Sequence, residues 1–403
     1  MTIVRRIVAA VIVLGCALGF VASASAQPTG TPIRIGSTLA LTGPLASTGI
    51  VHQLVGDIYV ADLNRRGGLL GRPVEWIVKD DQSKPELART LYEQLITVDK
   101  VDLLIGPYAT ANIVAAVGVA QRYDKIIWHH TAGVPSLLKY DMQFPTGGLP
   151  ADPEVSLPEL VFDAVAHAPK PPKTVAIVTS KFPSVHFISV GARDVAKKRG
   201  LQEVTFLEWE FGNRDYGAIA ARVKEANPDF LFIGAIGVEG LLLVDALRKI
   251  DYTPPIHFHM FPAPGPLAKA PAGQHALALT TFEQHPPFTN NPVAASFVKT
   301  FNDRAAKANL PDNQVELQAA GSFATWQTIE AAVNGANSID DKALAAWLKK
   351  HPVDTIIGTL RWETPSNYMP GARLYKVKQL QDGKWLVVWP PEFAAPGAKL
   401  LAP

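Results

Sequence analysis

Hydrophobic positions along the chain switch repeatedly between strand-like and helix-like spacing from residue 33 onward. Short apolar runs typical of buried strands lie at 33–36, 74–78, 101–105 and 126–128. Between these runs, apolar side chains recur at helical spacing, over 49–64, from Pro85 onward and over 110–122. This alternation predicts a parallel sheet that is covered by helices on both faces.

A second series of the same kind follows a stretch rich in proline and glycine at 144–150. Its strand-like runs lie at 175–178, 230–233 and 256–261, and longer helical patterns follow at 292–309 and 318–334. The last part, 373–389, alternates and turns at Gln381-Asp382-Gly383-Lys384, which predicts a β-hairpin. We therefore expect two sheets of the same type.

The first 26 residues have the pattern of a cleavable secretory signal peptide. Arg5 and Arg6 precede an uncharged run over 7–22, and small residues follow as far as Ala26. The run is short for a membrane anchor, which needs about 20 residues. Lipidation at Cys16 is a second alternative, because Val13-Leu14-Gly15-Cys16 resembles a lipobox. The main expectation is export to the periplasm through cleavage after Ala26.

Loss of this segment changes both the cysteine content and the charge. Cys16 is the only cysteine of the 403-residue chain, so the remaining 377 residues would contain no disulfide. Because Arg5 and Arg6 leave with the signal peptide, 36 basic residues would face 36 acidic ones. Zero net charge provides no long-range attraction to nucleic acid or to an anionic membrane. The length is typical of two domains.

Candidate binding chemistry lies where three strands of the first series end and helices begin, at 41–49, 106–110 and 129–133. Each of these joins carries hydroxyl side chains and backbone N–H groups at a helix start. Ligands bind at the carboxyl ends of parallel strands, and helix N-termini favour anions. A single serine or threonine there commonly only caps its helix. The three joins together predict a site for a small carboxylate.

Several motifs occur in a distinctive order: Leu41-Thr42-Gly43-Pro44, then Asp62-Leu63-Asn64 with Gly67-Gly68 and Leu70-Gly71-Arg72, then Asp80-Asp81 with Pro85 and Ala88, then Ile105-Gly106-Pro107, and finally 358–362 and 385–390. In this order the chain resembles the leucine/isoleucine/valine-binding protein family, the type I periplasmic solute receptors of ABC importers. The resemblance covers nearly all of the chain after the signal peptide.

The resemblance implies an α/β fold with two similar lobes, each a parallel sheet flanked by helices, joined by a three-crossing hinge. Lobe 1 is expected to comprise 31–147 and 282–365, and lobe 2 to comprise 148–281 and 366–392. Such proteins close their lobes over a small ligand and present the closed form to a permease in the inner membrane. We expect a monomer without a cofactor.

The resemblance also carries ligand-binding positions onto this chain. The family's carboxylate-binding hydroxyl corresponds to Thr110, with Ala109 beside it, and its next binding segment corresponds to Thr131, Ala132 and Gly133. The family's aromatic residue in the first loop falls on Thr48, and its tyrosine in the second lobe falls near Ile236. Amino-acid binders of the family have a threonine at the position of Gly133, and their acid that holds the ligand ammonium falls near Ala263. An ammonium enclosed without a carboxylate is poorly compensated. We therefore expect a carboxylate with an aromatic or aliphatic body.

The walls of such a pocket should be mainly apolar with a few polar contacts. The residues expected to provide them are Phe182, Ile236, Phe261, Phe323, Tyr108 and His130. Glu239 keeps a second interpretation open, a branched-chain amino acid receptor, if its carboxylate reaches the cleft. A third interpretation keeps the fold and makes the protein a sensor that delivers its closed form to a signalling partner.

Two other function classes have little support in the sequence. The chain contains neither a Gly-x-Ser-x-Gly elbow nor a P-loop, so we expect no enzymatic activity. The pairs His129-His130 and His257-x-His259 are the candidate metal ligands, but no cysteine or clustered acid completes a tetrahedral set. We therefore expect no bound metal.

Overall fold

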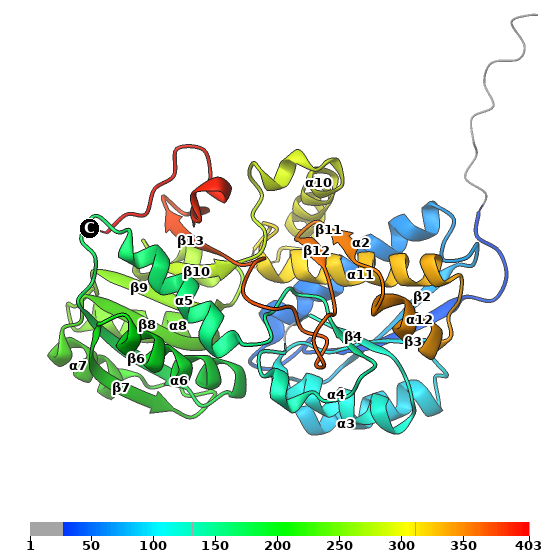
Figure 1. The fold of residues 1–403 in the computed structure, drawn as a ribbon, viewed down its shortest axis with the longest axis horizontal. Helices are drawn as coiled ribbons and strands as arrows, with labels where there is room; N and C mark the ends of the chain where they lie inside the picture. Colours follow the sequence, from blue (N-terminus) through cyan, green and yellow to red (C-terminus); the bar gives the residue numbers. More distant parts are fainter. Residues whose placement is uncertain (1–26, 131, 311, 403) are drawn as a thin grey trace, which may run out of the picture.

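The computed structural model describes residues 27–402 except residues 131 and 311. These residues form two α/β lobes that lie side by side along the long axis of the molecule (Figure 1), which confirms the expected fold class. The expected signal peptide, including Cys16, lies outside the described residues, and so does Thr131. Within the described part of the chain, no helix combines the length and the apolar character needed to cross a bilayer.

The first lobe is built on five parallel strands in the spatial order β2-β1-β3-β4-β5. Their bounds are Ile33–Leu39 (β1), Val74–Asp80 (β2), Leu103–Ile105 (β3), Ile127–His129 (β4) and Gln143–Pro145 (β5). The connecting helices are Ala46–Arg65 (α2), Pro85–Thr97 (α3) and Thr110–Arg122 (α4). The predicted helix over 110–122 is therefore confirmed. Because β1, β3 and β4 are neighbours, the three predicted joins meet at one edge of this sheet.

The second lobe is built on seven strands in the order β14-β13-β10-β9-β8-β6-β7. The parallel strands are Thr174–Ser180 (β6), Gln202–Trp209 (β7), Phe230–Gly237 (β8), Ile256–Pro262 (β9) and Leu277–Thr280 (β10). Lys376–Gln381 (β13) and Lys384–Trp389 (β14) add an antiparallel end to the sheet. The sheet is therefore mixed, whereas a wholly parallel sheet was expected.

The predicted hairpin is confirmed between β13 and β14. Its turn residues Asp382 and Gly383 have φ values of 49° and 74°. Positive φ at both central residues is the requirement of the type I′ turn, whose twist matches that of the strands it joins. Helices of this lobe are Pro153–Ala166 (α5), Pro183–Lys198 (α6), Gly217–Ala226 (α7), Glu239–Lys249 (α8) and Pro266–Lys269 (α9).

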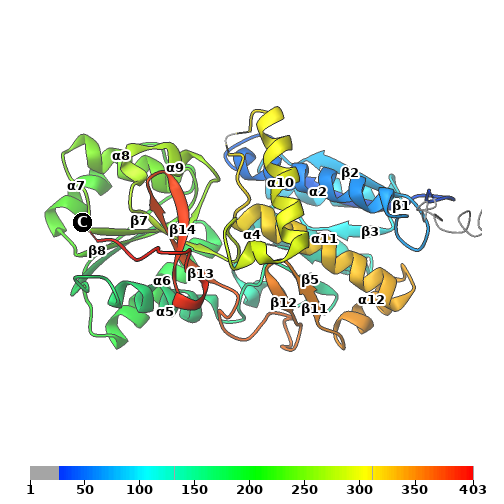
Figure 2. The same cartoon turned by 90° about the horizontal axis from the view of Figure 1, so that it is seen from above.

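The chain passes between the lobes three times. After β10 it returns to the first lobe as Pro292–Lys307 (α10), Leu317–Ala336 (α11), Asp341–Leu348 (α12), Val353–Thr355 (β11) and Gly358–Leu360 (β12). Figure 2 shows α10 and α11 over the first lobe, where both pack against α2. The crossings thus lie between β5 and α5, between β10 and α10, and between β12 and β13. The expected lobe boundaries fall within these connections, and their exact positions stay a prediction.

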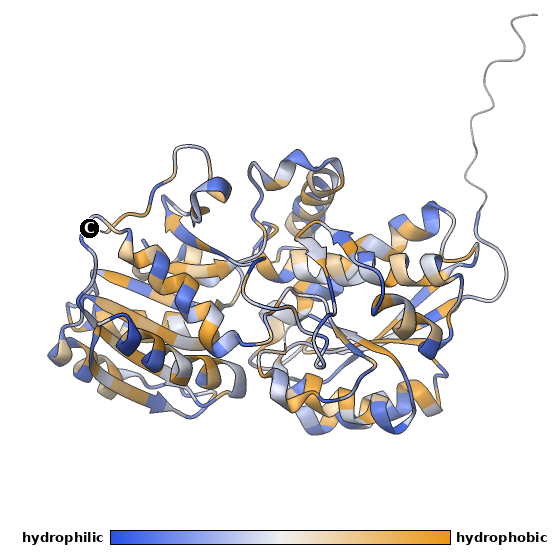
Figure 3. Cartoon of the chain, viewed as in Figure 1, coloured by the Kyte–Doolittle hydropathy of each residue, from blue (hydrophilic) through white to orange (hydrophobic). Residues whose placement is uncertain are grey.

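Apolar residues concentrate in the strands and on the inner faces of the helices (Figure 3). In the first lobe, Leu103 and Leu104 are fully buried, because helices cover both faces of the sheet. Between strand β2 and helix α11, Trp76 meets Trp326 edge-on at 5.4 Å between ring centroids.

Candidate functional site

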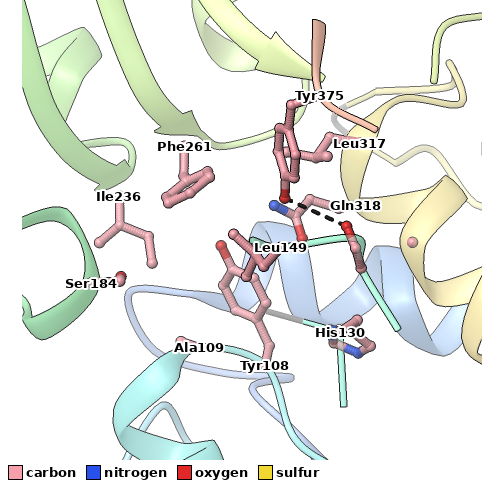
Figure 4. A pocket seen from close by; sticks show the side chains of 12 residues that line it. Tyr108, Ala109, His130, Leu149, Ser184, Ile236, Phe261, Leu317, Gln318 and Tyr375 are labelled. Atoms are coloured by element: carbon pink, nitrogen blue, oxygen red, sulfur yellow. Dashed lines mark hydrogen bonds between the residues drawn. The ribbon is translucent and has the colours of Figure 1, made fainter. Parts of the chain in front are cut away.

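A narrow pocket with a cavity volume of about 20 Å³ lies between the two lobes (Figure 4). It receives residues from the carboxyl ends of strands in both sheets, from the start of α11 and from the hinge connections. The lining residues are Tyr108, Ala109, His130, Gly147, Leu149, Ser184, Ile236, Phe261, Leu317, Gln318, Gly321 and Tyr375. The carboxyl edges of the two sheets therefore face each other across this pocket, as expected for a ligand site in open α/β sheets.

The first-lobe wall is formed where β3 turns into α4. Ala109 is the N-cap of α4 and has φ +75°, a conformation that L-residues rarely adopt. Because this N-cap residue is an alanine, its own side chain cannot cap the helix. Strained backbone of this kind concentrates at binding sites. The Thr110 hydroxyl accepts a hydrogen bond from the Gly133 N–H at 3.0 Å, which ties the second join to the third.

A second helix start faces the pocket from the other lobe. Phe182 is the N-cap of α6, and its side chain cannot cap the helix either. Ser184 lies in the first turn of α6 and lines the pocket. Two helix N-termini, each with partial positive charge, therefore approach one another from opposite lobes, and this arrangement favours an anion.

The apolar part of the pocket belongs mainly to the second lobe. Ile236 and Phe261 are register partners on the adjacent strands β8 and β9. Side chains of paired residues in a sheet project from the same face, and both of these line the pocket (Figure 4). Leu149 and Leu317 add apolar surface from the hinge side. Walls of this kind favour the hydrocarbon part of a ligand.

The start of α11 differs from the other two helix starts because it is capped by its own acid. Glu316 is the N-cap, and its side chain accepts a hydrogen bond from the Gln318 backbone N–H at 2.9 Å. Nearby, the Tyr375 hydroxyl donates to the Gly147 carbonyl at 3.5 Å. Because the Glu316 carboxyl occupies this helix terminus, this end of the pocket does not favour a second anion.

Two stacked histidines adjoin the pocket. His130 lines it and stacks on His52, with ring centroids 3.9 Å apart and 8° between the ring planes. Burial lowers the pKa of His52 to about 3 and the pKa of His130 well below its ordinary value. Both rings are therefore neutral near pH 7. No Asp, Glu, Lys or Arg occurs among the described residues that line the pocket, so the polar groups that it presents are neutral.

Five of the predicted site residues come together in this pocket. They are Tyr108, Ala109, His130, Ile236 and Phe261. Thr131 is outside the described residues, and the other six lie around the pocket without lining it. Thr48 is buried in α2 beside Tyr108, where it partly offsets the rise that burial causes in the Tyr108 pKa.

The remaining hydroxyl and backbone positions of the first lobe have structural partners. The Thr110 hydroxyl holds the Gly133 N–H, as described above. The Ala132 carbonyl accepts a hydrogen bond from the Tyr368 hydroxyl at 2.8 Å. Gly133 lies directly against Ser184 of the other lobe, since a Cβ at Gly133 would be 2.7 Å from the Ser184 Cβ. These residues shape the third join and the contact between the lobes.

Phe182 and Phe323 are the predicted wall residues that the structure places elsewhere. Phe182 packs on Phe211, with ring centroids 4.9 Å apart. Phe323 stacks on Phe297 at 4.1 Å and lines a separate groove between α2, α10 and α11. An α-helix turns about 100° per residue, so Phe323 lies about 140° around α11 from Gln318. Phe323 therefore does not line this pocket.

Glu239, the residue that kept an ammonium site open, is held inside the second lobe. One carboxylate oxygen accepts hydrogen bonds from the Trp209 indole and the Gly212 N–H, both at 3.1 Å. The side chain is buried, and it does not line the pocket. Burial raises its pKa. Ala263, the position that corresponds to the family's ammonium-binding acid, does not line the pocket either.

Three of the four histidines considered as metal ligands, His129, His257 and His259, belong to the core, whereas His130 lines the pocket. His257 Nδ1 and His259 Nε2 lie 3.0 Å apart, which confirms that they share one strand face. His129 hydrogen-bonds the Gln143 side chain. Across the described residues, no group of three or more His, Cys, Asp or Glu side chains is placed to hold a metal ion.

Sequence reasoning missed seven lining residues: Gly147, Leu149, Ser184, Leu317, Gln318, Gly321 and Tyr375. Ser184 had a usable signal, because it follows the second-lobe strand β6 and Pro183 just as the predicted joins follow theirs. The others come from the hinge connections and from α11. These segments reach the pocket only because the chain crosses between the lobes, and the local sequence pattern does not indicate these crossings.

Comparison with known proteins places this architecture in a family. A family model described as periplasmic binding protein matches residues 32–384. The chain is 25% identical over 346 residues to the Leu/Ile/Val-binding protein of Escherichia coli (strain K12), which covers 82% of this chain and 86% of that protein.

Two solved structures share the fold. A leucine binding protein from Thermotoga maritima superposes with a TM-score of 0.75 at 19% identity, covering 88% of this chain and 97% of that one. An ABC transporter solute binding protein from R. palustris, in complex with benzoate, superposes with a TM-score of 0.73 at 18% identity, covering 93% and 99%. At these identities the likeness establishes the two-lobed architecture.

Proposed function

Because the chain belongs to the periplasmic binding protein family, we propose that it is the receptor of an ABC importer and captures a small carboxylate with an aromatic or aliphatic body. The family consists of binding proteins rather than enzymes, in agreement with the expected absence of catalytic motifs. The ligand would be enclosed by the two lobes and released to a permease in the inner membrane.

One observation carries the choice of ligand. The pocket lies at the N-termini of two helices, α4 and α6, and its walls contain no charged side chain among the described residues. The partial positive charge of these termini favours a carboxylate, and the Ser184 hydroxyl supplies a donor. An α-ammonium beside that carboxylate would find no acid, and burying it unpaired is costly.

The names of similar proteins support two classes of carboxylate ligand, amino acids and aromatic acids. The printed name of the Escherichia coli relative states that it binds leucine, isoleucine and valine. The R. palustris structure contains benzoate. Every one of these ligands carries a carboxylate, and benzoate alone lacks the ammonium. The position of Glu239, sequestered by Trp209 and Gly212, favours the benzoate-like class for this chain.

Location and assembly follow from the same proposal. The signal-like segment at 1–26 and the family membership support export to the periplasm, with cleavage after Ala26 preferred to lipidation at Cys16. The proposed partner is an ABC permease, and the receptor acts as a monomer. Lobe closure is the signal that the permease reads, because ligand contacts exist on both sides of the pocket only in the closed form.

A thermal-shift screen tests the ligand class. The purified protein is heated with benzoates, phenylpropionates, short branched acids and amino acids, each at the same concentration. A ligand that binds the folded state alone raises the melting temperature by mass action. We expect stabilisation by aromatic or aliphatic acids. Stabilisation by leucine or valine, without any response to the acids, would establish the amino-acid receptor instead.

A further inference from the structure

A buried cluster of two acids and one lysine joins the lobes at the hinge. Glu283 lies in the second crossing, after β10, Lys378 lies on β13 just after the third crossing, and Glu316 begins α11 in the first lobe. Lys378 Nζ lies 2.6 Å from Glu283 Oε1 and 3.9 Å from Glu316 Oε2. The side chains of Lys378 and Glu283 are 3% exposed and that of Glu316 is 10% exposed. The cluster therefore connects the lobes through charges that water hardly reaches.

The lysine of this cluster can balance the charge of one carboxylate. Lys378 donates a hydrogen bond to Glu283, so Glu283 takes the short contact and Glu316 the longer one. Two buried carboxylates that share one cation do not both ionise readily, because the second charge stays uncompensated. Burial raises the pKa of Glu316 to about 7, with Lys378 opposing the rise and Glu283 adding to it. Glu316 is therefore the acid of the cluster that holds a proton most easily.

Further titratable groups face the cluster from other elements. Asp312, in the connection before α11, adds to the rise in the Glu316 pKa. Tyr108, in the join before α4, has its own pKa raised by burial and by Glu316, so its hydroxyl is neutral. Lys269 of α9 acts on Asp312. Lys378 lowers the pKa of Asp312 as well as those of the two glutamates, so three acids share this one lysine.

The charge of Glu316 is coupled to the opening of the pocket. Glu316 is the N-cap of α11, and the next two residues, Leu317 and Gln318, line the pocket (Figure 4). Separation of the lobes admits water beside this helix start and moves Glu316 away from Lys378. Burial is the largest influence on the Glu316 pKa, so the gain of water outweighs the loss of the lysine and favours the ionised form. Closure over a ligand carboxylate has the opposite effect, because it removes water and adds a negative charge.

We propose that Glu316 takes up a proton from the solvent when the lobes close over a ligand, so that the hinge cluster of Glu283, Lys378 and Glu316 strengthens ligand capture as the pH falls. This inference rests on the proposed function, because it requires a ligand that closes the lobes. Protonated Glu316 leaves Lys378 and Glu283 as a balanced pair. Its carbonyl oxygen can still accept the hydrogen bond from the Gln318 N–H, so α11 keeps its cap.

Calorimetric titration measures this proton directly. The wild-type protein is titrated at about pH 6.5 with benzoate, 3-phenylpropionate, 4-methylpentanoate and leucine, each in two buffers with different heats of ionisation. Carboxylic acids of this kind titrate near pH 4.3, as a glutamate side chain does, so a difference in heat between the buffers reports a proton bound by the protein. We expect uptake of about 0.5 proton or more per ligand, and a dissociation constant about tenfold larger at pH 7.5 than at pH 5.5.

Three variants assign the proton. Glu316→Gln keeps an acceptor for the Gln318 N–H and removes the titrating group, so proton uptake should vanish and the dissociation constant should no longer depend on pH. Glu283→Gln leaves Lys378 to balance Glu316, which then stays ionised, so uptake should also fall. Glu225→Gln removes one carboxylate at a 79% exposed position of α7 and should keep the wild-type uptake. The wild-type measurement stands even if a cluster variant fails to fold.

The outcomes separate the two proposals. If acids bind without proton uptake, or if uptake persists in Glu316→Gln, the role of Glu316 is wrong and the carboxylate receptor stands. If leucine alone binds and does so with proton uptake, the proposed ligand class is wrong and the role of Glu316 stands. If leucine alone binds without proton uptake, or if none of the four compounds binds, both proposals fail.

Discussion

Replacing Gly133 by alanine should hold the two lobes apart and weaken ligand binding. Gly133 follows β4 in the first lobe, and Ser184 belongs to α6 in the second. A Cβ at Gly133 would lie 2.7 Å from the Ser184 Cβ, whereas carbon atoms pack at about 3.5–4.0 Å. The Ser184 Cβ is fixed to its backbone and cannot rotate away, so the lobes must separate by about 1 Å.

The cost of this separation sets the expected loss of affinity. Overpacking of a tight contact costs about 1–3 kcal/mol, which corresponds to a dissociation constant about 5–150 times larger. The penalty applies to the closed form, because only closure brings the lobes together. The melting temperature of the ligand-free protein should therefore change less than the affinity. Isothermal titration calorimetry with the tightest acid from the screen measures the effect.

Matched variants make this prediction refutable. Gly118→Ala introduces the same methyl group on α4, where nothing lies within 4 Å, and should leave the dissociation constant unchanged. In a Ser184→Gly background the obstructing Cβ is absent, so Gly133→Ala should have little further effect. Wild-type affinity in Gly133→Ala, or an equal loss in both backgrounds, would refute the reasoning.

Three further predictions concern charge and hydrogen bonding. Burial raises the pKa of Glu316 to about 7, so the folded state binds a proton more tightly than the unfolded chain. The free energy of unfolding should therefore fall by up to about 3 kcal/mol as the pH rises from about 4.5 to 7. Urea unfolding at several pH values should show this fall for the wild type and not for Glu316→Gln. For His52 the sign is opposite, because burial lowers its pKa to about 3; from pH 7 to pH 5 the wild type should lose about 2 kcal/mol more than His52→Asn, and equal losses would contradict a neutral buried ring. Thr110→Ala removes the acceptor of the Gly133 N–H and should weaken ligand binding by about 1–3 kcal/mol; unchanged affinity by calorimetry would show that this hydrogen bond does not shape the site.

Much of the fold was predictable because its strands and helices have strong local patterns. The short apolar strands β3, β4 and β8 are buried on both faces and read as continuous apolar runs. The strand β7 was missed, since all its residues except Trp209 are half-buried or exposed and they include Glu203 and Glu208. The antiparallel addition of β13 to β10 was also missed, because the pairing of distant strands is a tertiary choice.

The site was predictable where one strand end alone determines it. Tyr108 and His130 directly follow β3 and β4, so the rule for parallel sheets located them. Gln318 and Tyr375 reach the pocket only because the chain crosses between the lobes, and their sequence neighbourhoods contain no sign of this. Gly133 was expected from the family resemblance as a ligand position, whereas the structure places it at the contact with Ser184.

The measurement that tests the central claim most directly is the affinity for one carbon skeleton with and without an ammonium. Leucine and 4-methylpentanoate differ only in that group, and so do phenylalanine and 3-phenylpropionate. In calorimetric titrations, the account predicts that the acid without the ammonium binds more tightly in at least one pair, by about two orders of magnitude or more, because the pocket lining has no carboxylate to pair with the ammonium. Tighter binding of the amino acid in both pairs would contradict it.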